Sequence, residues 1–267
     1  MSETNPDVAP PGSGLRVLGL GLLLMAVYQL PEGLGIRWWG GRMDALAALW
    51  LAYYLAAWGV GRALGRRGFR SFGLGLEPGF GARFGTLLLA ALGAKALALG
   101  VGSHLGILRV APLAATPSTF ALPLVIAALS TFVPSLAEDL LTRGLPWRRL
   151  PGAWGTMGFV AASALLFVLN HVYRLGKGPL EWAFLFTLGL VYAAALVREG
   201  TLWAAVALHW GWNLANAGVD LRWDVTALRP GQAPLLSMGA HLLLLGLVLA
   251  LPRRSRSASP EAPALPA

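Results

Sequence analysis

Long apolar segments, separated by short polar and glycine-rich connections, dominate the hydropathy pattern of the chain. A helix needs about 20 mostly apolar residues to cross the hydrocarbon core of a bilayer. We predict such a helix in each of eight segments: residues 15–31, 43–61, 84–102, 119–142, 155–173, 182–197, 202–217 and 235–251. The pattern therefore predicts an all-α membrane protein, a polytopic bundle of about eight transmembrane helices.

The predicted helices form one integral-membrane domain, residues 15–254, between two polar tails. Residues 1–14 and 255–267 are rich in Pro, Ser and Ala, and we predict that both tails are disordered. The short connection at residues 198–201 predicts a tight helical hairpin. The basic, glycine-rich connection at residues 62–83 is predicted to be an irregular loop.

Composition agrees with a membrane protein and excludes several other classes. Only 12% of the residues are charged, whereas a soluble domain carries about 25%. This deficit excludes a nucleic-acid-binding domain, a disordered chain and an ordinary water-soluble enzyme. The chain contains no cysteine, so a disulfide, a thiolate metal site and a cysteine nucleophile are excluded as well.

The distribution of Lys and Arg among the connections predicts how the bundle is oriented. An even number of helices puts both termini on one side of the membrane, and that side receives more Lys and Arg than the other. Because positive charge collects in cytoplasmic loops, we predict that both termini are cytoplasmic. We place the protein in the cell membrane, with the lipid bilayer as its surroundings and no nucleic-acid partner.

Ionisable and amide side chains gather in three of the predicted helices. A charged side chain near the centre of a spanning helix costs about 2.5–3.5 kcal/mol on insertion scales, so each one requires a partner or a function. The three helices contain Glu138, Asp139 and Arg143, then Asn170 and His171, and finally His209 and Asn213. The remaining polar residues of the spans are predicted to be interfacial or snorkelling: Asp44, Lys95, His104 and His241.

Helical spacing sorts these groups by direction. Asp139 and Arg143 are four residues apart with the acid first, the favoured order for an ion pair. Neighbours differ by about 100° around a helix axis, so Glu138 must face elsewhere. His209 and Asn213 share a face of their helix, and Pro134 is predicted to kink the helix that carries Glu138. A carboxylate, two imidazoles and a carboxamide can therefore meet in one intramembrane cavity.

These side chains suit hydrolysis by either of two routes. A carboxylate backed by an imidazole can deprotonate water for attack on a peptide carbonyl, while a second His and an Asn donate hydrogen bonds to the oxyanion. Alternatively, Glu138, His171 and His209 match the ligand set of a catalytic zinc with an open fourth position. The residues themselves leave both routes open.

Three motifs, each on its own helix and in a fixed order, resemble those of the CPBP intramembrane proteases. This family, also called Abi, includes the type II CAAX prenyl endopeptidases. The motifs are Glu138-Asp139-x-x-x-Arg143, Phe167-x-x-x-His171 and His209-x-x-x-Asn213. The resemblance implies an intramembrane endopeptidase whose core lies at about residues 119–217 and whose substrate is a membrane-associated peptide or protein.

The resemblance also implies a role for each motif residue. Glu138 would activate water, assisted by His171, while His209 and Asn213 would bind the oxyanion. Asp139 stands where Glu is commoner in the family, and Arg143 would be structural. Members of the family are described both as metalloproteases and as metal-independent glutamate proteases, so the resemblance implies no definite cofactor and zinc stays possible.

Two functions of other classes fit the same polar groups. Buried acid–His clusters also form proton relays, which would make the protein a proton-coupled transporter. A non-catalytic scaffold that binds a partner within the bilayer is the third hypothesis. The three hypotheses predict different observations. A protease cleaves a peptide, a transporter shows flux driven by a pH gradient, and a scaffold only binds its partner.

Overall fold

The computed structural model describes residues 13–64, 68–76, 78–113, 121–147 and 151–252. The long helices are α1 (Ser13–Leu30), α2 (Met43–Ala63), α3 (Phe80–His104), α4 (Ala121–Asp139), α6 (Pro151–Asn170), α7 (Pro179–Glu199), α8 (Leu202–Asp220) and α9 (Ala233–Ala250). Short helical turns adjoin them: η1 (Pro31–Trp38), η2 (Gly68–Phe72), η4 (Leu140–Gly144), α5 (Leu145–Trp147) and η5 (Val172–Lys177). The predicted class, a helical membrane bundle, is confirmed.

Six helical segments of the described chain are long and apolar enough to cross a membrane: Gly14–Trp38, Met43–Ala63, Phe80–His104, Ala121–Trp147, Pro179–Glu199 and Ala233–Ala250. We predicted about eight spans, and the two predicted spans that are missing from these six correspond to α6 and α8. The regular part of α6, Gly155–Asn170, is shorter than the others. Helix α8 carries His209 and Asn213, and these polar groups reduce its apolar character.

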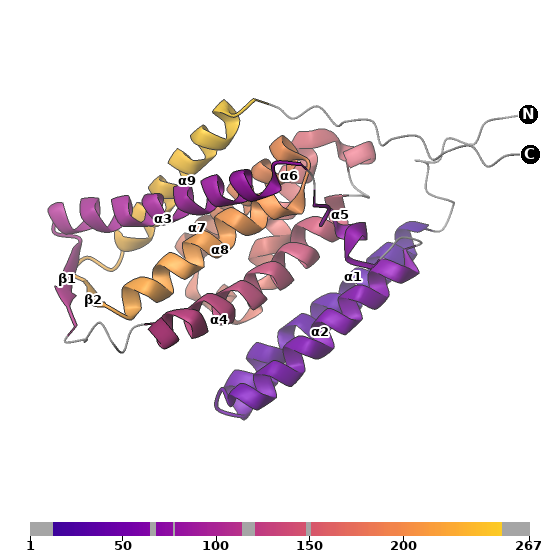
Figure 1. The fold of residues 1–267 in the computed structure, drawn as a ribbon, viewed down its shortest axis with the longest axis horizontal. Helices are drawn as coiled ribbons and strands as arrows, with labels where there is room; N and C mark the ends of the chain where they lie inside the picture. Colours follow the sequence, from indigo (N-terminus) through magenta and orange to yellow (C-terminus); the bar gives the residue numbers. More distant parts are fainter. Residues whose placement is uncertain (1–12, 65–67, 77, 114–120, 148–150, 253–267) are drawn as a thin grey trace, which may run out of the picture.

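The core of the bundle runs along α7 and the first half of α8, where most side chains are buried. Helix α8 packs against α3 and α4, and α7 packs against α6 and α9. The α1–α2 hairpin lies at one side of this assembly (Figure 1). It approaches α4 and η2, so it can form one wall of a site on α4.

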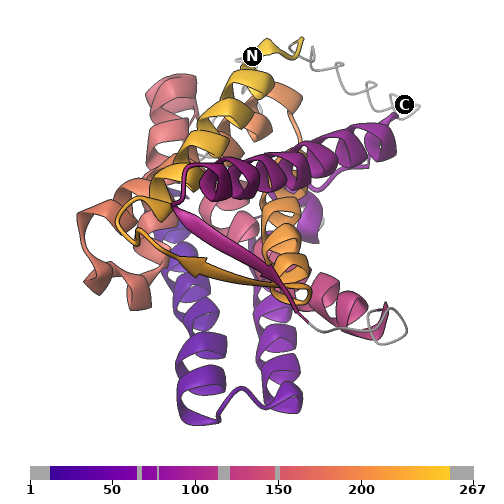
Figure 2. The same cartoon turned by 90° about the vertical axis from the view of Figure 1, so that its left-hand side faces the viewer.

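A short antiparallel ribbon departs from the all-helical prediction. Strand β1 (Leu108–Pro112) pairs with β2 (Trp223–Ala227), with Val110 opposite Val225. Figure 2 shows the ribbon crossing the end of the bundle beside α3 and α8. Each strand has five residues and lies in a connection between helices. The ribbon joins two connections that are distant in the sequence.

Several predicted boundaries change. Helix α1 begins at Ser13, inside the segment predicted to be a disordered tail, and the rest of both tails lies outside the described residues. The loop predicted to be irregular at residues 62–83 contains η2, in which Ser71 and Phe72 are buried. The predicted hairpin between α7 and α8 is confirmed, and Gly200 turns the chain there with φ 72°.

The segment predicted to span residues 155–173 ends earlier. Gly155 has φ 63° and ψ −178°, which separates the regular helix from the residues before it. The helix ends at Asn170, and His171 lies directly after it with φ −87° and ψ 52°. His171 is therefore the residue between α6 and η5 and not part of a spanning helix.

Helices α6 and α7 pack closely at Gly189. A Cβ atom there would lie 2.7 Å from the Ala164 Cα atom. We expect Gly189→Ala to lower the free energy of unfolding by roughly 1–3 kcal/mol because the backbones must separate. Gly93→Ala on α3 is the matched control, since nothing lies within 4 Å of that position. Thermal unfolding in detergent measures both, and equal melting temperatures would contradict the prediction.

Candidate active site

Glu138 and Asp139 lie at the end of α4, where the helix changes its hydrogen-bonding pattern. Pro134 lies inside α4 and cannot donate a backbone hydrogen bond. The π-helical turn η4 follows directly and contains Arg143. Such turns inside helices occur frequently at functional sites. Two acids and a guanidinium therefore lie within the six successive residues from Glu138 to Arg143.

Arg143 and Asp139 form an ion pair in the centre of the protein. The Arg143 Nη1 atom contacts Asp139 Oδ1, and both side chains are 0% exposed. The guanidinium also lies over the rings of Phe167, at 4.6 Å, and Tyr192, at 5.1 Å. Asp139 is therefore neutralised within the helix that carries Glu138.

Glu138 faces two imidazoles from different elements. His209 Nε2 lies 3.6 Å from Glu138 Oε2, and His171 Nε2 lies 3.9 Å from Glu138 Oε1. These distances exceed a direct hydrogen bond, and separations of this size are commonly bridged by water. The Glu138 side chain is 12% exposed.

The second nitrogen of each imidazole has its own partner. His171 Nδ1 lies 2.7 Å from the Phe167 carbonyl oxygen, and His209 Nδ1 lies 3.4 Å from Asp139 Oδ1. Because a carbonyl can only accept a hydrogen bond, Nδ1 of His171 carries the proton. In its neutral form this ring therefore turns the lone pair of Nε2 toward Glu138.

Asn213 contacts α4 one turn before the acids. Its Nδ2 atom donates a hydrogen bond of 3.0 Å to Ser135 Oγ. The structure thus brings Glu138, His171 and His209 together and leaves Asn213 beside them. Among the hydrogen bonds of the described residues, none joins Asn213 to Glu138.

Residues 120–215 match the model of the family described as type II CAAX prenyl endopeptidase Rce1-like. Residues 120–215, here called the Rce1-like segment, are therefore similar to that family. The segment contains all three motifs, so the resemblance inferred from them is confirmed. No curated protein and no solved structure matches the chain.

The family match supports a protease of the CAAX type that works within a membrane. It begins just before α4 and ends in α8, so the α1–α2 hairpin, α3 and α9 lie outside the Rce1-like segment. Two side chains from these outer elements nevertheless reach the site, one by touching Glu138 and the other by touching Tyr192, whose ring stacks on His209. Neither was predicted as part of a site from the sequence.

Tyr28 on α1 is the first of these side chains. Its hydroxyl contacts Glu138 Oε1 directly. A single tyrosine in an apolar segment carries no signal in the sequence, because its partner is 110 positions away. Only the packing of α1 beside α4 reveals the contact.

His241 on α9 is the second. It was predicted to be interfacial or snorkelling, and this is wrong, because its side chain is 0% exposed. His241 Nε2 lies 2.9 Å from the Tyr192 hydroxyl, and Nδ1 lies 2.8 Å from the Ser237 carbonyl oxygen. The Tyr192 ring stacks on His209 with centroids 4.8 Å apart. His241 therefore supports the tyrosine that packs against His209.

A cleft of about 700 Å³ leads along α4 to Glu138. It lies between the α1–η1 segment, α2 and α4, and its walls are mostly apolar. The lining residues of α4 run from Ile126 to Glu138, and Tyr28 lies on the opposite wall. The apolar cleft thus ends at the Glu138 carboxylate, which faces the imidazoles.

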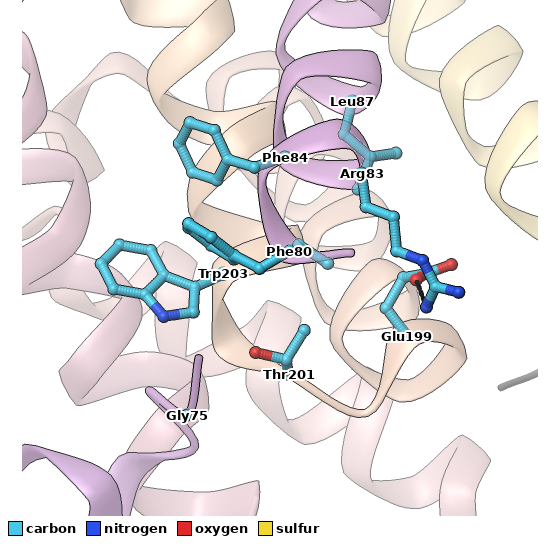
Figure 3. Close-up of a pocket in the computed structure, with 9 residues that line it drawn as sticks. Gly75, Phe80, Arg83, Phe84, Leu87, Glu199, Thr201 and Trp203 are labelled. Carbon is cyan, nitrogen blue, oxygen red and sulfur yellow. Dashed lines mark hydrogen bonds and ion pairs between the residues drawn. The ribbon is translucent and has the colours of Figure 1, made fainter. Parts of the chain in front are cut away.

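A second, much smaller pocket lies away from this site. It measures about 20 Å³ and is bounded by α3 and the α7–α8 hairpin. Figure 3 shows Arg83 directed toward Glu199, with which it forms an ion pair of 3.3 Å. None of the predicted site residues lines it. The Arg83–Glu199 ion pair joins α3 to the α7–α8 hairpin, and we assign this pocket no catalytic role.

Glu138, His171 and His209 are the residues that the sequence offers as an alternative zinc set. Among the residues that the structure describes, no three or more His, Asp or Glu side chains are grouped to hold a metal ion. In addition, Glu138 Oε1 is already in contact with the Tyr28 hydroxyl. If a zinc ion were bound, Glu138, His171 and His209 would be its protein ligands.

Proposed function

We propose that the protein is an intramembrane endopeptidase in which Glu138 activates water for attack on a peptide bond. The single observation that carries this proposal is the position of Glu138, between an apolar cleft and two imidazoles. A substrate backbone in the cleft would reach the carboxylate from one side. The imidazoles would orient the water from the other side.

The proposed reaction begins with proton transfer from water. Glu138 Oε2 has no hydrogen-bond donor among the described residues, so it is available to accept the proton. The water oxygen then attacks the carbonyl carbon, and the carbonyl oxygen becomes an oxyanion. Return of the proton from Glu138 to the amide nitrogen lets the oxyanion collapse and the C–N bond break, which releases an amine and a carboxylic acid. The acid then gives its proton to the amine, so the products leave as carboxylate and ammonium.

His171, His209 and Asn213 would assist these steps. His171 directs Nε2 toward Glu138 and can help to hold the water. His209 Nε2 lies nearest the other carboxylate oxygen, Oε2, and, when protonated, can donate to the oxyanion. Asn213 would have to exchange its contact with Ser135 for the oxyanion.

The substrate would be a membrane-associated polypeptide. The apolar walls of the cleft favour an apolar chain or a lipid-modified one. We also propose that the protein resides in the cell membrane with both termini in the cytoplasm, as the distribution of Lys and Arg predicts. The reaction needs no metal in this scheme.

The test uses purified full-length protein in detergent and two internally quenched peptides. Both peptides end in Cys-Ala-Ala-X, and only one is prenylated on the cysteine. We expect at least one to be cleaved at a single bond, as shown by mass spectrometry, and the rate to persist in EDTA and in 1,10-phenanthroline.

Each other outcome contradicts a stated part of the proposal. Loss of cleavage with either chelator, restored by zinc, would favour the metal-dependent route. Absence of cleavage of both peptides would contradict the proposed function. Proteoliposomes that dissipate a pH gradient without cleaving peptide would instead favour the transporter.

A further inference from the structure

The α1–α2 hairpin contributes a hydroxyl group to the Glu138 carboxylate. Tyr28 lies on α1, outside the Rce1-like segment, and its hydroxyl contacts Glu138 Oε1. The ring is partly buried and packs edge-on against Trp50 and Tyr53, with centroids 5.7 Å apart in each pair. These contacts from α2 hold the tyrosine in place while its hydroxyl faces α4.

The contact makes the two carboxylate oxygens of Glu138 different. A carboxylate only accepts hydrogen bonds, so Tyr28 is the donor and Oε1 is engaged. The other oxygen, Oε2, receives no hydrogen bond from the described residues and lies 3.6 Å from His209 Nε2. Without the tyrosine hydroxyl, the carboxylate can rotate about its terminal torsion, which is broad and roughly two-fold.

Further contacts fix the hairpin to the site. The Tyr53 hydroxyl donates to the Ala137 carbonyl oxygen at 2.7 Å, and the Tyr54 hydroxyl donates to the Val133 carbonyl oxygen at 2.6 Å. Gln29 Nε2 donates to the Asn170 carbonyl oxygen at 3.0 Å, next to His171. The hairpin therefore contacts both chain segments that carry Glu138 and His171.

We infer that Tyr28 is a positioning residue that holds the Glu138 carboxylate with Oε1 on the tyrosine hydroxyl and Oε2 toward His209. The α1–α2 hairpin thereby completes an active site that the family match locates only in the later part of the chain. This inference rests on the proposed function, because it assigns Tyr28 an effect on the rate at which Glu138 acts.

The test compares Tyr28→Phe with Tyr53→Phe, using whichever quenched Cys-Ala-Ala-X peptide the parent cleaves. Both variants lose one hydroxyl of the same hairpin, but only Tyr28 contacts Glu138. We expect Tyr28→Phe to lower kcat about 10- to 100-fold, the size expected for a misplaced catalytic group. Its KM should stay within about twofold, because cleft shape is retained. Tyr53→Phe should lower kcat much less than Tyr28→Phe does, because the Tyr53 hydroxyl does not touch the carboxylate.

Other outcomes separate this inference from the proposed function. Parent kcat in Tyr28→Phe, together with inactivity of Glu138→Gln, overturns the inference alone. A raised KM with unchanged kcat also overturns it, because Tyr28 would then act on binding. A Tyr28→Phe protein that does not fold contradicts it as well, since the hydroxyl would then be structural. A parent that cleaves neither peptide contradicts both.

Discussion

Glu138→Gln is expected to fold like the parent and to lose kcat by about 10²- to 10⁴-fold, the range for loss of a general base. Glutamine keeps the shape of the side chain and can still accept the Tyr28 hydrogen bond through its amide oxygen. It cannot take a proton from water. Steady-state cleavage of the quenched peptide measures the loss, and KM should change little because the apolar cleft is intact.

The matched control for this variant is Glu199→Gln. Glu199 is also buried, but it pairs with Arg83 beside the small pocket, away from the cleft. We expect it to retain kcat even if its melting temperature falls. If Glu138→Gln cleaved peptide as fast as the parent, Glu138 would not be the base, and the transporter and scaffold hypotheses would regain weight.

The helices were predictable because they depend on local composition. A span must be long and apolar whatever it packs against, so α2 and α9 begin and end within two residues of the predicted 43–61 and 235–251. The β1–β2 ribbon was not predictable in the same way. Its five-residue strands lie in separate connections, and neither connection indicates its partner.

The same difference between local and long-range contacts applies to the candidate site. Spacing within one helix predicted that Asp139 would meet Arg143, and the structure places them in contact although a π-helical turn begins between them. Phe167 and His171 are likewise four residues apart in their motif, and their rings are 4.6 Å apart even though the helix ends before His171. Local neighbours survive such changes because the chain between them is short.

Contacts between distant segments could not be predicted from spacing. Tyr28 and His241 lie in helices that are mostly apolar, and such residues are commonly interfacial or satisfied by packing. Their partners, Glu138 and Tyr192, are on other helices. The sequence therefore identified the groups that do the proposed chemistry but not the groups that orient them.

The Asp139–Arg143 pair is expected to have the largest effect on folding. Both side chains are fully buried, and removal of one partner from such a pair leaves an uncompensated charge that costs about 3–5 kcal/mol. We therefore expect Arg143→Met to lower the melting temperature in detergent strongly, more than Gly189→Ala does. The exposed pair of Arg42 and Asp44 provides the control, and Arg42→Met should leave the melting temperature nearly unchanged.

The double variant Asp139→Asn with Arg143→Met distinguishes pairing from packing. If the cost of Arg143→Met is the unpaired Asp139 charge, removing that charge should restore much of the lost melting temperature. If the cost instead comes from the loss of the guanidinium that packs on the rings of Phe167 and Tyr192, the double variant should be at least as unstable as Arg143→Met. Because Asp139 Oδ1 also faces His209 Nδ1, a restored melting temperature without restored cleavage would assign Asp139 a second role in orienting that imidazole.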